Sequence, residues 1–418
     1  MGFTSMPFIR RRYYNVFYVT HFLFIPASLF AVMHWGPIVI WLFATIVIYI
    51  ANRMLSAATI QAPIAIKKAV AYEHDVTELS FECVAPYKPG DVVYIKVPAV
   101  SSTQWHPFSV ASSALHTPEV LTIYIKTLGK WTAQVHEYVC QCSAANVDPV
   151  VYVDGGYVSP APVPSSFEKL IFVGGGIGVT PLMSQIMHVL YTQPHQEVHL
   201  VWHARDVRLM SQFEPWLRDA LAVSSRLHLH LHVTQKNEVV NVNGMNRTIV
   251  YDTKASSVPP RPYTKLSLWR QIAMMVIAFA CAGGLLIAVH YGYKIQAVDP
   301  KYWPLQRFVE FFAVVVGAYW AYVVVLIRPL KVPSFPMDNH GNKINDGTMS
   351  VDTFAKQYCV EYCRADWEKL FGDFVQHASN KSLPTIGVYV SGPKSLSRVV
   401  DELTNQPMFS VHHEEFEM

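Results

Sequence analysis

Long apolar stretches alternate with polar ones along the chain, and four of the apolar stretches could each cross a lipid bilayer. They cover residues 13–35, 36–52, 271–290 and 308–327. The second, at about 17 residues, is at the lower limit for spanning a hydrocarbon core of about 30 Å. A turn at Gly36-Pro37 joins the first two stretches, and residues 291–307 join the last two. The pattern therefore predicts two membrane hairpins, far apart in the sequence.

Basic residues flank both hairpins on the side away from their turns. They are Arg10, Arg11, Arg12, Arg53, Lys67 and Lys68 around the first hairpin, and Arg261, Lys265, Arg270, Arg328 and Lys331 around the second. The positive-inside rule then predicts that both chain ends and everything between the hairpins are cytosolic. Lys294, Lys301 and Arg307 in the second turn weaken this argument for the second hairpin. The alternative interpretation of residues 10–33 is a cleaved signal peptide. Signal peptides have a shorter apolar run than this segment, which argues against that interpretation.

The stretch between the hairpins has the pattern of soluble domains. Short segments rich in β-branched and aromatic residues predict strands that close into an antiparallel β-barrel. They are residues 64–84, 91–98, 121–127 and 149–153. From Lys169 onward, apolar strands alternate with a glycine-rich turn and helices, which predicts an α/β domain with a parallel sheet. After a polar linker at 332–350, a helix over 351–375, a strand over 386–392 and a helix over 393–403 complete that domain.

These patterns predict five consecutive segments. Residues 1–54 form a transmembrane hairpin, 55–165 the barrel, 166–265 the first part of the α/β domain, 266–331 an inserted transmembrane hairpin, and 332–418 the rest of the α/β domain. The composition agrees with membrane insertion, because 51% of residues are hydrophobic and 15% are charged, against about 25% charged in soluble domains. The net charge of +3 gives no reason to expect a nucleic-acid partner.

The cysteines and one run of histidines are candidates for metal sites. The six cysteines lack paired CxxC spacing, which argues against a disulfide framework and a zinc site. Cys359 and Cys363 are expected to share a helix face as packing residues. An alternating Leu-His run places His228, His230 and His232 on one face of a strand, where a half-solvated surface is favoured over a metal site.

The first chemical motif is His106-Pro107-Phe108-Ser109, at the end of a predicted strand. An imidazole, a fixed turn, an aromatic ring and a hydroxyl could hold a planar ring with polar edges. Together with the KPGD sequence at 88–91, this motif resembles the flavin-binding barrel of the ferric reductase and NADPH oxidase family. The resemblance implies that these four residues hold FAD.

Two further segments extend this resemblance. Residues 125–132 resemble the family's segment that faces the FAD diphosphate, which implies FAD contacts from Lys126, Gly129, Trp131 and Thr132. Lys126 replaces the usual arginine, so that the positive charge is kept and the bidentate fork is lost. Gly155 lies in a turn similar to a third FAD-binding segment, from which Gly156 and Val158 depart.

The second motif, GGGIGVTP at 174–181, follows an apolar strand and opens a predicted helix. Glycines let the backbone approach a pyrophosphate, and a helix N-terminus supplies free N–H groups. The spacing differs from GxGxxG and resembles the nicotinamide-dinucleotide turn of the ferredoxin-reductase-like superfamily. The resemblance implies NADPH contacts from Gly174, Gly175, Gly176, Ile177, Gly178, Thr180 and Pro181.

Three other positions refine this expectation. Arg205, at the end of the next strand, could pair with a 2′-phosphate and so favours NADPH over NADH, the alternative being a surface arginine. The Ser391-Gly392-Pro393 turn resembles the family's CGP turn beside the nicotinamide, with Ser391 in place of cysteine. Family members end in an aromatic residue that stacks on the flavin, for which Phe416 is the candidate. The resemblance thus implies catalytic roles for Ser391 and Phe416.

His21 and His34 lie 13 positions apart in a segment that resembles the last haem-binding helix of the same family. About 20 Å of helix would separate them, which suits two haem b groups at different membrane depths. The alternative is a packed His21 and an interfacial His34 beside Trp35. A straight helix would point the two rings to different sides, although Pro26 could bend it. Each haem needs two axial ligands, so further helices, a second copy or another subunit would have to complete the sites.

The resemblance predicts a membrane protein with α-helical hairpins and a ferredoxin-reductase-like module. Its activity would be that of an NADPH-dependent flavoprotein reductase, closest to plant-type ferric-chelate reductases because a hairpin interrupts the nucleotide domain. FAD would pass single electrons through haem to a ferric chelate or another one-electron acceptor, at the plasma membrane or an endomembrane. The alternatives are a superoxide-generating NADPH oxidase and a truncated, non-catalytic member; Gly156, Val158 and Ser391 favour the latter.

Overall fold

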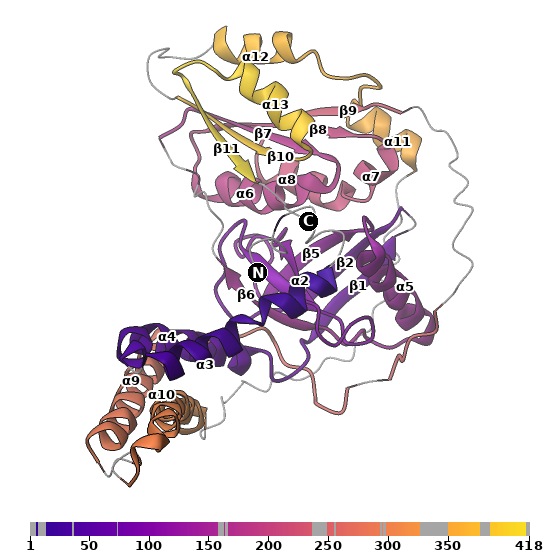
Figure 1. Cartoon of the computed structure of the whole chain (residues 1–418). Coiled ribbons are helices and arrows are strands. Elements are labelled where there is room, and N and C mark those ends of the chain that lie inside the picture. Colours follow the sequence, from indigo (N-terminus) through magenta and orange to yellow (C-terminus); the bar gives the residue numbers. More distant parts are fainter. Residues whose placement is uncertain are drawn as a thin grey trace. The chain divides into compact units, whose positions relative to one another are not determined.

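A computed structural model shows the chain as two compact units. It describes residues 6, 14–35, 37–72, 74–157, 163, 166–235, 249–254, 256–292, 295, 298–326, 350–376 and 385–414. One unit combines Met1–Gln61 with Lys265–Ser334, and the other combines Ala62–Thr264 with Phe335–Met418 (Figure 1). The first unit is helical, and the second contains all the strands. The predicted linker at 332–350 lies outside the described residues except for Ser350.

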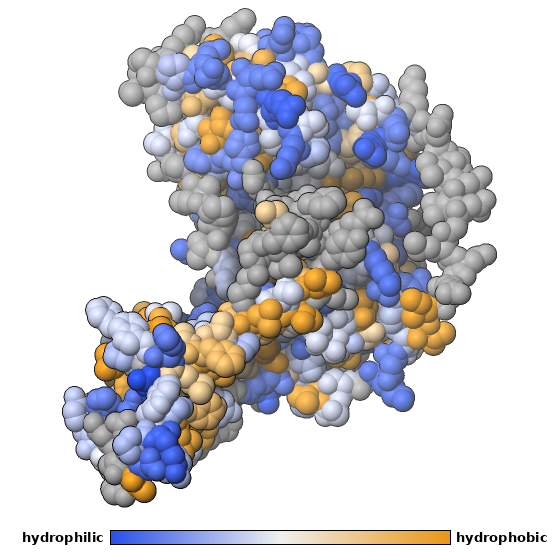
Figure 2. Space-filling view, in the orientation of Figure 1, coloured by the Kyte–Doolittle hydropathy of each residue, from blue (hydrophilic) through white to orange (hydrophobic). Residues whose placement is uncertain are grey.

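The helical unit is built from two segments of the chain. Its described helices are α2 (Tyr14–His21), α3 (Phe24–His34), α4 (Ile38–Thr59), α9 (Leu268–Tyr291) and α10 (Trp303–Leu326), with a 3-10 turn, η4, at Pro300–Tyr302. The segments Ile38–Ala57 and Leu268–Tyr291 are long and apolar enough to cross a membrane, whereas the apolar helical stretch Val19–His34 is shorter. Large hydrophobic side chains are exposed on this unit, including Ile40, Trp41, Trp269 and Trp320. Figure 2 shows hydrophobic residues on the visible face of these helices.

The apolar stretch at residues 13–35 forms two helices, α2 and α3, separated by a turn at Phe22-Leu23, where the bend expected from Pro26 lies. Pro26 explains the break. Its ring would clash with the carbonyl of Phe22 in a continuous helix, and it has no N–H to donate to that carbonyl. In the first turn of α3 the missing N–H has no cost, since no intrahelical acceptor is available there.

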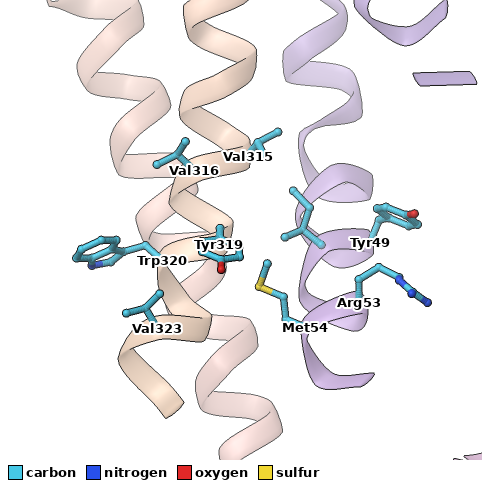
Figure 3. Close-up of a pocket in the computed structure, with 9 residues that line it drawn as sticks. Tyr49, Arg53, Met54, Val315, Val316, Tyr319, Trp320 and Val323 are labelled. Carbon is cyan, nitrogen blue, oxygen red and sulfur yellow. The ribbon is translucent and has the colours of Figure 1, made fainter. Parts of the chain in front are cut away.

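Small and β-branched side chains fill the contact between the helices of this unit. They include Val32, Val47, Ala51, Ala278, Ala282, Val314 and Ala318. A pocket of about 480 Å³ opens between α4 and α10, and its lining atoms are apolar. Met54 of α4 and Tyr319 of α10 point toward one another across it (Figure 3).

The antiparallel part of the second unit consists of two three-stranded sheets, β1-β2-β5 and β4-β3-β6. The strands are β1 (Ile66–Tyr72), β2 (Val76–Glu82), β3 (Val92–Lys96), β4 (His106–Ser109), β5 (Val120–Lys126) and β6 (Tyr152–Tyr157). Their inward-facing residues, such as Leu79, Ile95, Ile123 and Val153, share one core with helix α5 (Lys130–Ala145). The described strands thus form two antiparallel sheets around one core, without a single continuous ladder, and closure into the expected barrel stays a prediction.

The nucleotide-type part of the unit is a five-stranded parallel sheet in the order β11-β10-β7-β8-β9. Its strands are β7 (Lys169–Gly175), β8 (Glu197–Ala204), β9 (Leu227–Val233), β10 (Ile386–Ser391) and β11 (Phe409–Glu414). Its helices are α6 (Val179–Thr192), α7 (Val207–Ser211), α8 (Glu214–Val223), α11 (Val351–Gln357), α12 (Trp367–Gln376) and α13 (Lys394–Leu403). Helices α6 and α8 lie on one face and α12 and α13 on the other (Figure 1). The predicted α/β alternation is confirmed.

Two expectations about this part were wrong. The helix expected over 351–375 is interrupted between α11 and α12, where Cys359 takes a positive φ of 50°. Cys359 and Cys363 therefore do not share a helix face; both are exposed. The sequence reasoning also missed β11, which pairs in parallel with β10 at the sheet edge.

The histidine face of β9 is half covered, in agreement with the expectation of a half-solvated strand: His228 is exposed, His230 is half-buried and His232 is buried. His199 and His203 of β8 lie in register with His228 and His232 of β9, so these rings share a face of the sheet. Helix α12 packs on that face through Trp367, which stacks on His203, and through Phe374, which contacts His199 and His230. Burial lowers the pKa of His199 and of His203 to about 4. A parallel sheet is normally covered on both faces, which explains why part of this histidine face is buried.

Candidate flavin and nucleotide site

Strand β4 presents the His106-Phe108 pair next to the first turn of α5. It pairs with β3, with His106 opposite Ile95 and Phe108 opposite Val93. The His106 ring stacks on Trp131 at 3.9 Å between centroids and 28° between planes, and the Phe108 ring lies 6.1 Å from the same indole. The structure thus brings together three ring-bearing residues from two separate sequence segments, the HPFS motif and residues 125–132.

Two polar atoms in this cluster are buried without a hydrogen-bond partner among the described residues. They are Nε2 of His106 and Nε1 of Trp131. Burial lowers the pKa of His106, so its imidazole is favoured in the neutral form. A buried donor or acceptor without a partner costs about 1–3 kcal/mol. A flavin, which has a planar ring with polar edges, fits this combination of stacked rings and unsatisfied atoms.

The start of α5 is held by Thr132. Its Oγ1 accepts hydrogen bonds from the backbone N–H groups of Leu128 and Gly129, both at 3.0 Å. Lys126 Nζ donates to the carbonyl of His74 at 3.0 Å, a contact that a bound diphosphate would have to replace. A FAD diphosphate beside this helix start remains a prediction.

Gly155 has a packing explanation of its own. It lies opposite Val93 in the β3–β6 ladder. A Cβ atom at Gly155 would lie 2.6 Å from Val93 Cγ1, closer than real Cβ contacts. The absence of a side chain here is therefore required by the sheet, and the flavin contact inferred from the resemblance remains a prediction. Val158, which departs from the family's FAD-binding segment, lies outside the described residues.

The glycine-rich turn connects β7 to α6 through the 3-10 turn η2 (Gly176–Gly178). Gly176 has a φ of +59°, which L side chains rarely adopt. Its carbonyl accepts a hydrogen bond of 2.9 Å from Trp202 Nε1, and Thr180 Oγ1 donates to the Ile177 carbonyl at 3.0 Å. The turn is thus fixed before any ligand arrives, while the N-terminus of α6 faces the same edge.

The Ser391-Gly392-Pro393 turn lies directly against the glycine-rich turn. Strand β10 pairs with β7, with Ser391 opposite Gly174. A Cβ atom at Gly178 would lie 2.6 Å from the Ser391 carbonyl oxygen, and one at Gly175 would lie 2.7 Å from Pro393 Cδ. Two motifs that are remote in sequence thus form one surface, and glycine is required where they touch.

This contact is at the topological switch point of the sheet. From β7 the chain continues to β8 and β9 on one side, and later returns to β10 on the other side. In open parallel sheets ligands bind beyond the carboxyl ends of the strands at that crossover. Ser391 is fully buried there, and its hydroxyl has no partner among the described residues. The site therefore fits a dinucleotide, and the Ser391 hydroxyl is available there to form a hydrogen bond with it.

The antiparallel sheets and the nucleotide-type sheet are joined by specific contacts. Gly90 N–H, in the KPGD turn, donates to Ser184 Oγ of α6 at 2.8 Å. The rings of Tyr124 and Phe213 lie 4.7 Å apart across the same boundary. These contacts hold the β4 aromatic cluster and the glycine-rich turn in one compact unit.

Arg205 is exposed directly after β8, at the carboxyl edge of the sheet. The neighbouring Arg208 is engaged, because it forms an ion pair of 2.6 Å with Asp206. No ion pair of Arg205 occurs within the described part of the chain. Its guanidinium is therefore available to an incoming phosphate.

Replacing Arg205 by alanine is expected to raise the KM for NADPH about tenfold or more and to leave the KM for NADH nearly unchanged. A charge-assisted hydrogen bond contributes roughly 1.5–3 kcal/mol, and tenfold in binding is about 1.4 kcal/mol. Steady-state kinetics with both nucleotides would measure this. Arg218→Ala, on an arginine that is 62% exposed and pairs with Glu214, is the matched control. Equal effects of Arg205→Ala on both nucleotides would contradict the assignment.

The expected aromatic at the chain end, Phe416, lies outside the described residues. The strand before it, β11, runs parallel to β10 and ends at Glu414. Gln185 of α6 donates to the Glu414 carboxylate at 2.6 Å. The last described residue is therefore tied to the helix that follows the glycine-rich turn.

The helical unit does not fit the predicted pair of haems. The sequence of this unit contains three histidines, His21, His34 and His290, whereas two bis-histidine haems need four. His290 Nδ1 lies 3.1 Å from Glu310 Oε1, which also accepts a hydrogen bond from Gln306. His290 is thus engaged, and the helix that would carry the other two is broken at Phe22. The histidines of this unit alone therefore do not complete two haem sites.

Comparison with known proteins agrees with the geometry. A family model described as an FAD-binding domain matches residues 61–161, and one described as a ferric reductase NAD binding domain matches residues 167–405. The Arabidopsis thaliana protein "Ferric reduction oxidase 3, mitochondrial" is 26% identical over 310 residues, which are 72% of this chain and 43% of that protein. "Ferric reduction oxidase 2" of the same plant is 33% identical over 201 residues, or 46% of this chain and 27% of that protein.

A more distant relative is the heavy chain of a superoxide-generating NADPH oxidase from Dictyostelium discoideum. It is 23% identical over 273 residues, covering 55% of this chain and 38% of that protein. The chain thus spans less than half the length of each of these relatives. The NAD-binding match covers more than half of the 418 residues and includes both turns that meet at the switch point. The chain therefore belongs to the ferric reductase family.

Proposed function

We propose that this chain is the reductase part of a membrane-bound NADPH-dependent flavoprotein, which passes electrons from NADPH through FAD to a ferric chelate or another one-electron acceptor. The observation that carries the proposal is the contact of the Gly174–Gly178 turn with the Ser391–Pro393 turn at the switch point. The β4 aromatic cluster, with its unsatisfied His106 and Trp131 nitrogens, belongs to the same compact unit.

Each group of residues has a separate task in this proposal. The turn at Gly176 and Gly178 lets the pyrophosphate of NADPH approach the start of α6, and Arg205 receives its 2′-phosphate. Ser391 would face the nicotinamide, and its buried hydroxyl, which has no partner among the described residues, would donate or accept one hydrogen bond there. His106, Phe108 and Trp131 orient the flavin ring and exclude water from one face. The bound flavin would accept a hydride and release electrons one at a time.

The first test uses the full chain purified in detergent micelles. We expect a flavin absorbance spectrum, its anaerobic bleaching by NADPH, and reduction of ferric citrate when this acceptor is added. A chain without bound flavin even when FAD is supplied would contradict the proposal and favour a non-catalytic family member. Oxygen consumption that exceeds iron reduction would instead favour a superoxide-generating oxidase.

The second test concerns the membrane. We propose that both hairpins, residues 13–52 and 271–327, cross the bilayer and return, with Ile38–Ala57 and Leu268–Tyr291 among their spans. The flavin and nucleotide sheets are then cytosolic, as the flanking basic residues predict. A short tag inserted at Pro300 should then be accessible outside intact cells, and one at Asn345 only after permeabilisation. Accessibility of both tags from the same side would overturn the topology.

The third test concerns haem. Since the helical unit has three histidines and His290 pairs with Glu310, the chain alone should show little low-spin haem. The reduced-minus-oxidised visible spectrum of the purified chain measures this directly. Stoichiometric low-spin bands that survive His290→Ala would show that a second copy completes the axial ligand sets of His21 and His34.

A further inference from the structure

A second cluster of chemically active side chains lies at the outer edge of β9. The segment after α11 adds one residue pair to that edge: Val233 N–H donates to the Glu361 carbonyl at 2.8 Å, and Glu361 N–H donates to the Leu231 carbonyl at 2.9 Å. This parallel bridge places Glu361 in register with His232. Residues in register on neighbouring strands present their side chains on the same face. The carboxylate and the imidazole are therefore brought together by backbone pairing.

Cys363, two residues after Glu361, completes the cluster. Glu361 Oε2 lies 3.5 Å from His232 Nδ1 and 3.6 Å from Cys363 Sγ. All three candidate ligand atoms lie within 4.8 Å of one another. The positive-φ turn at Cys359 directs the chain from α11 to this edge. One nitrogen, one oxygen and one sulfur thus converge on a common point.

The two spacings from Glu361 Oε2 match tetrahedral metal coordination. Zinc bonds are about 2.0–2.1 Å to histidine nitrogen, about 2.0–2.2 Å to carboxylate oxygen and about 2.3 Å to thiolate sulfur. At tetrahedral angles these bonds separate nitrogen from oxygen by about 3.4 Å and sulfur from oxygen by about 3.5 Å. The observed 3.5 and 3.6 Å agree with these values. At 3.5 Å the imidazole nitrogen is too far from the carboxylate for a good hydrogen bond.

The imidazole is buried, oriented and unsatisfied. His232 is 6% exposed, and its Nδ1 has no hydrogen-bond partner among the described residues. Its ring stacks on His203 at 4.9 Å, and His203 stacks in turn on Trp367 at 4.8 Å. Such packing fixes the direction of a ligand before the metal binds. Glu361 and Cys363 are exposed and leave a path from solvent.

We propose that His232, Glu361 and Cys363 bind a zinc ion, with a fourth position open to water or another ligand. Zinc suits this mixed nitrogen, oxygen and sulfur set, whereas magnesium and calcium prefer oxygen ligands alone. The ion would clamp the segment between α11 and α12 onto β9. The proposal is independent of flavin and nucleotide chemistry, because metal binding can be measured without activity.

Thiol protection is the sharpest test, because the chain supplies its own control. Cys359 and Cys363 are both exposed and lie four residues apart. In the full chain in micelles, zinc should slow the alkylation of Cys363 by iodoacetamide at least tenfold and leave Cys359 unchanged, as followed by peptide mass spectrometry. Equal protection of both cysteines, or of neither, would overturn the site.

Measurements of zinc affinity in variants distinguish the proposed ligands from neighbouring residues that do not bind the ion. Competition with a zinc-binding dye should show at least a tenfold loss of affinity in Cys363→Ser and in Glu361→Gln, and no change in Cys359→Ser. Both ligand variants alter exposed side chains, so folding should be preserved even if His232→Ala is unstable. Cobalt substitution should give thiolate charge-transfer bands that Cys363→Ser lacks.

One further control addresses another histidine cluster on the same face. His228 lies 3.5 Å from Glu197, which also contacts His199 at 3.2 Å. The variant His228→Ala should leave zinc affinity unchanged if the proposed site holds the ion. Loss of binding in His228→Ala together with full binding in Cys363→Ser would assign the metal to that other cluster and refute the proposal.

Discussion

Gly178→Ala is expected to lower kcat/KM for flavin reduction by NADPH at least about 100-fold, which corresponds to about 2.8 kcal/mol. The new Cβ atom would lie 2.6 Å from the Ser391 carbonyl oxygen, and this neighbour is backbone, which no side-chain rotation can relieve. The two turns must therefore separate at the point where NADPH is expected to bind. Stopped-flow bleaching of the flavin by NADPH would measure the loss, and full reduction by dithionite would show that the flavin itself is intact.

The control for this substitution is Gly372→Ala in α12. No atom lies within 4 Å of a Cβ built there. Alanine in a helix interior is favoured over glycine by about 0.5–1 kcal/mol, so this variant should be slightly more stable and reduce its flavin normally. Wild-type kinetics in Gly178→Ala would show that the contact between the two turns is not part of the nucleotide site.

The double variant His106→Ala with Ser109→Ala is expected to lose most of its bound FAD and keep its fold. It removes an imidazole stacked on Trp131 at 3.9 Å and a buried hydroxyl on the same strand. The variant therefore lacks His106 Nε2, the buried nitrogen without a partner that is expected to hydrogen-bond the edge of the flavin. Absorbance near 450 nm per protein measures flavin content, and circular dichroism reports folding.

His195→Ala, which changes an exposed loop histidine, is the matched control and should retain its flavin. A double variant with the full FAD content of the wild-type chain would show that the HPFS segment does not hold the flavin. A double variant that fails to fold can be replaced by His106→Ala alone, because Ser109 is the more deeply buried of the two residues.

Several elements could be predicted from the sequence because their causes are local. The β7–turn–α6 unit follows from an apolar strand, a run of glycines and an amphipathic helix. Helices α9 and α10 follow from uninterrupted apolar stretches. The motif residues were found for the same reason: each motif is a short, continuous pattern whose chemistry is visible without its neighbours.

Other features depended on partners that are remote in the sequence. The strand β11 is stabilised by pairing with β10 and was missed because its own pattern, FSVHHE, is only weakly apolar. The alternating histidines of β9 predict a half-solvated strand, and His228 is exposed there, but the contact of His230 with Phe374 of α12, more than 100 residues later, is not visible in the local pattern. The break after His21 was visible in principle, since Pro26 forbids a hydrogen bond to Phe22.

The sequence by itself determined the local motifs of this protein: a glycine-rich turn that opens a helix, an HPFS strand, a serine-glycine-proline turn and apolar helices. Only the tertiary structure decided that the two turns form one site. That outcome depends on β10 pairing with β7, so that Ser391 lies opposite Gly174. Backbone pairing between distant strands is set by the shared hydrophobic core and by sheet topology, and neither is encoded in a local pattern. The same long-range pairing brought His232, Glu361 and Cys363 together at the edge of β9.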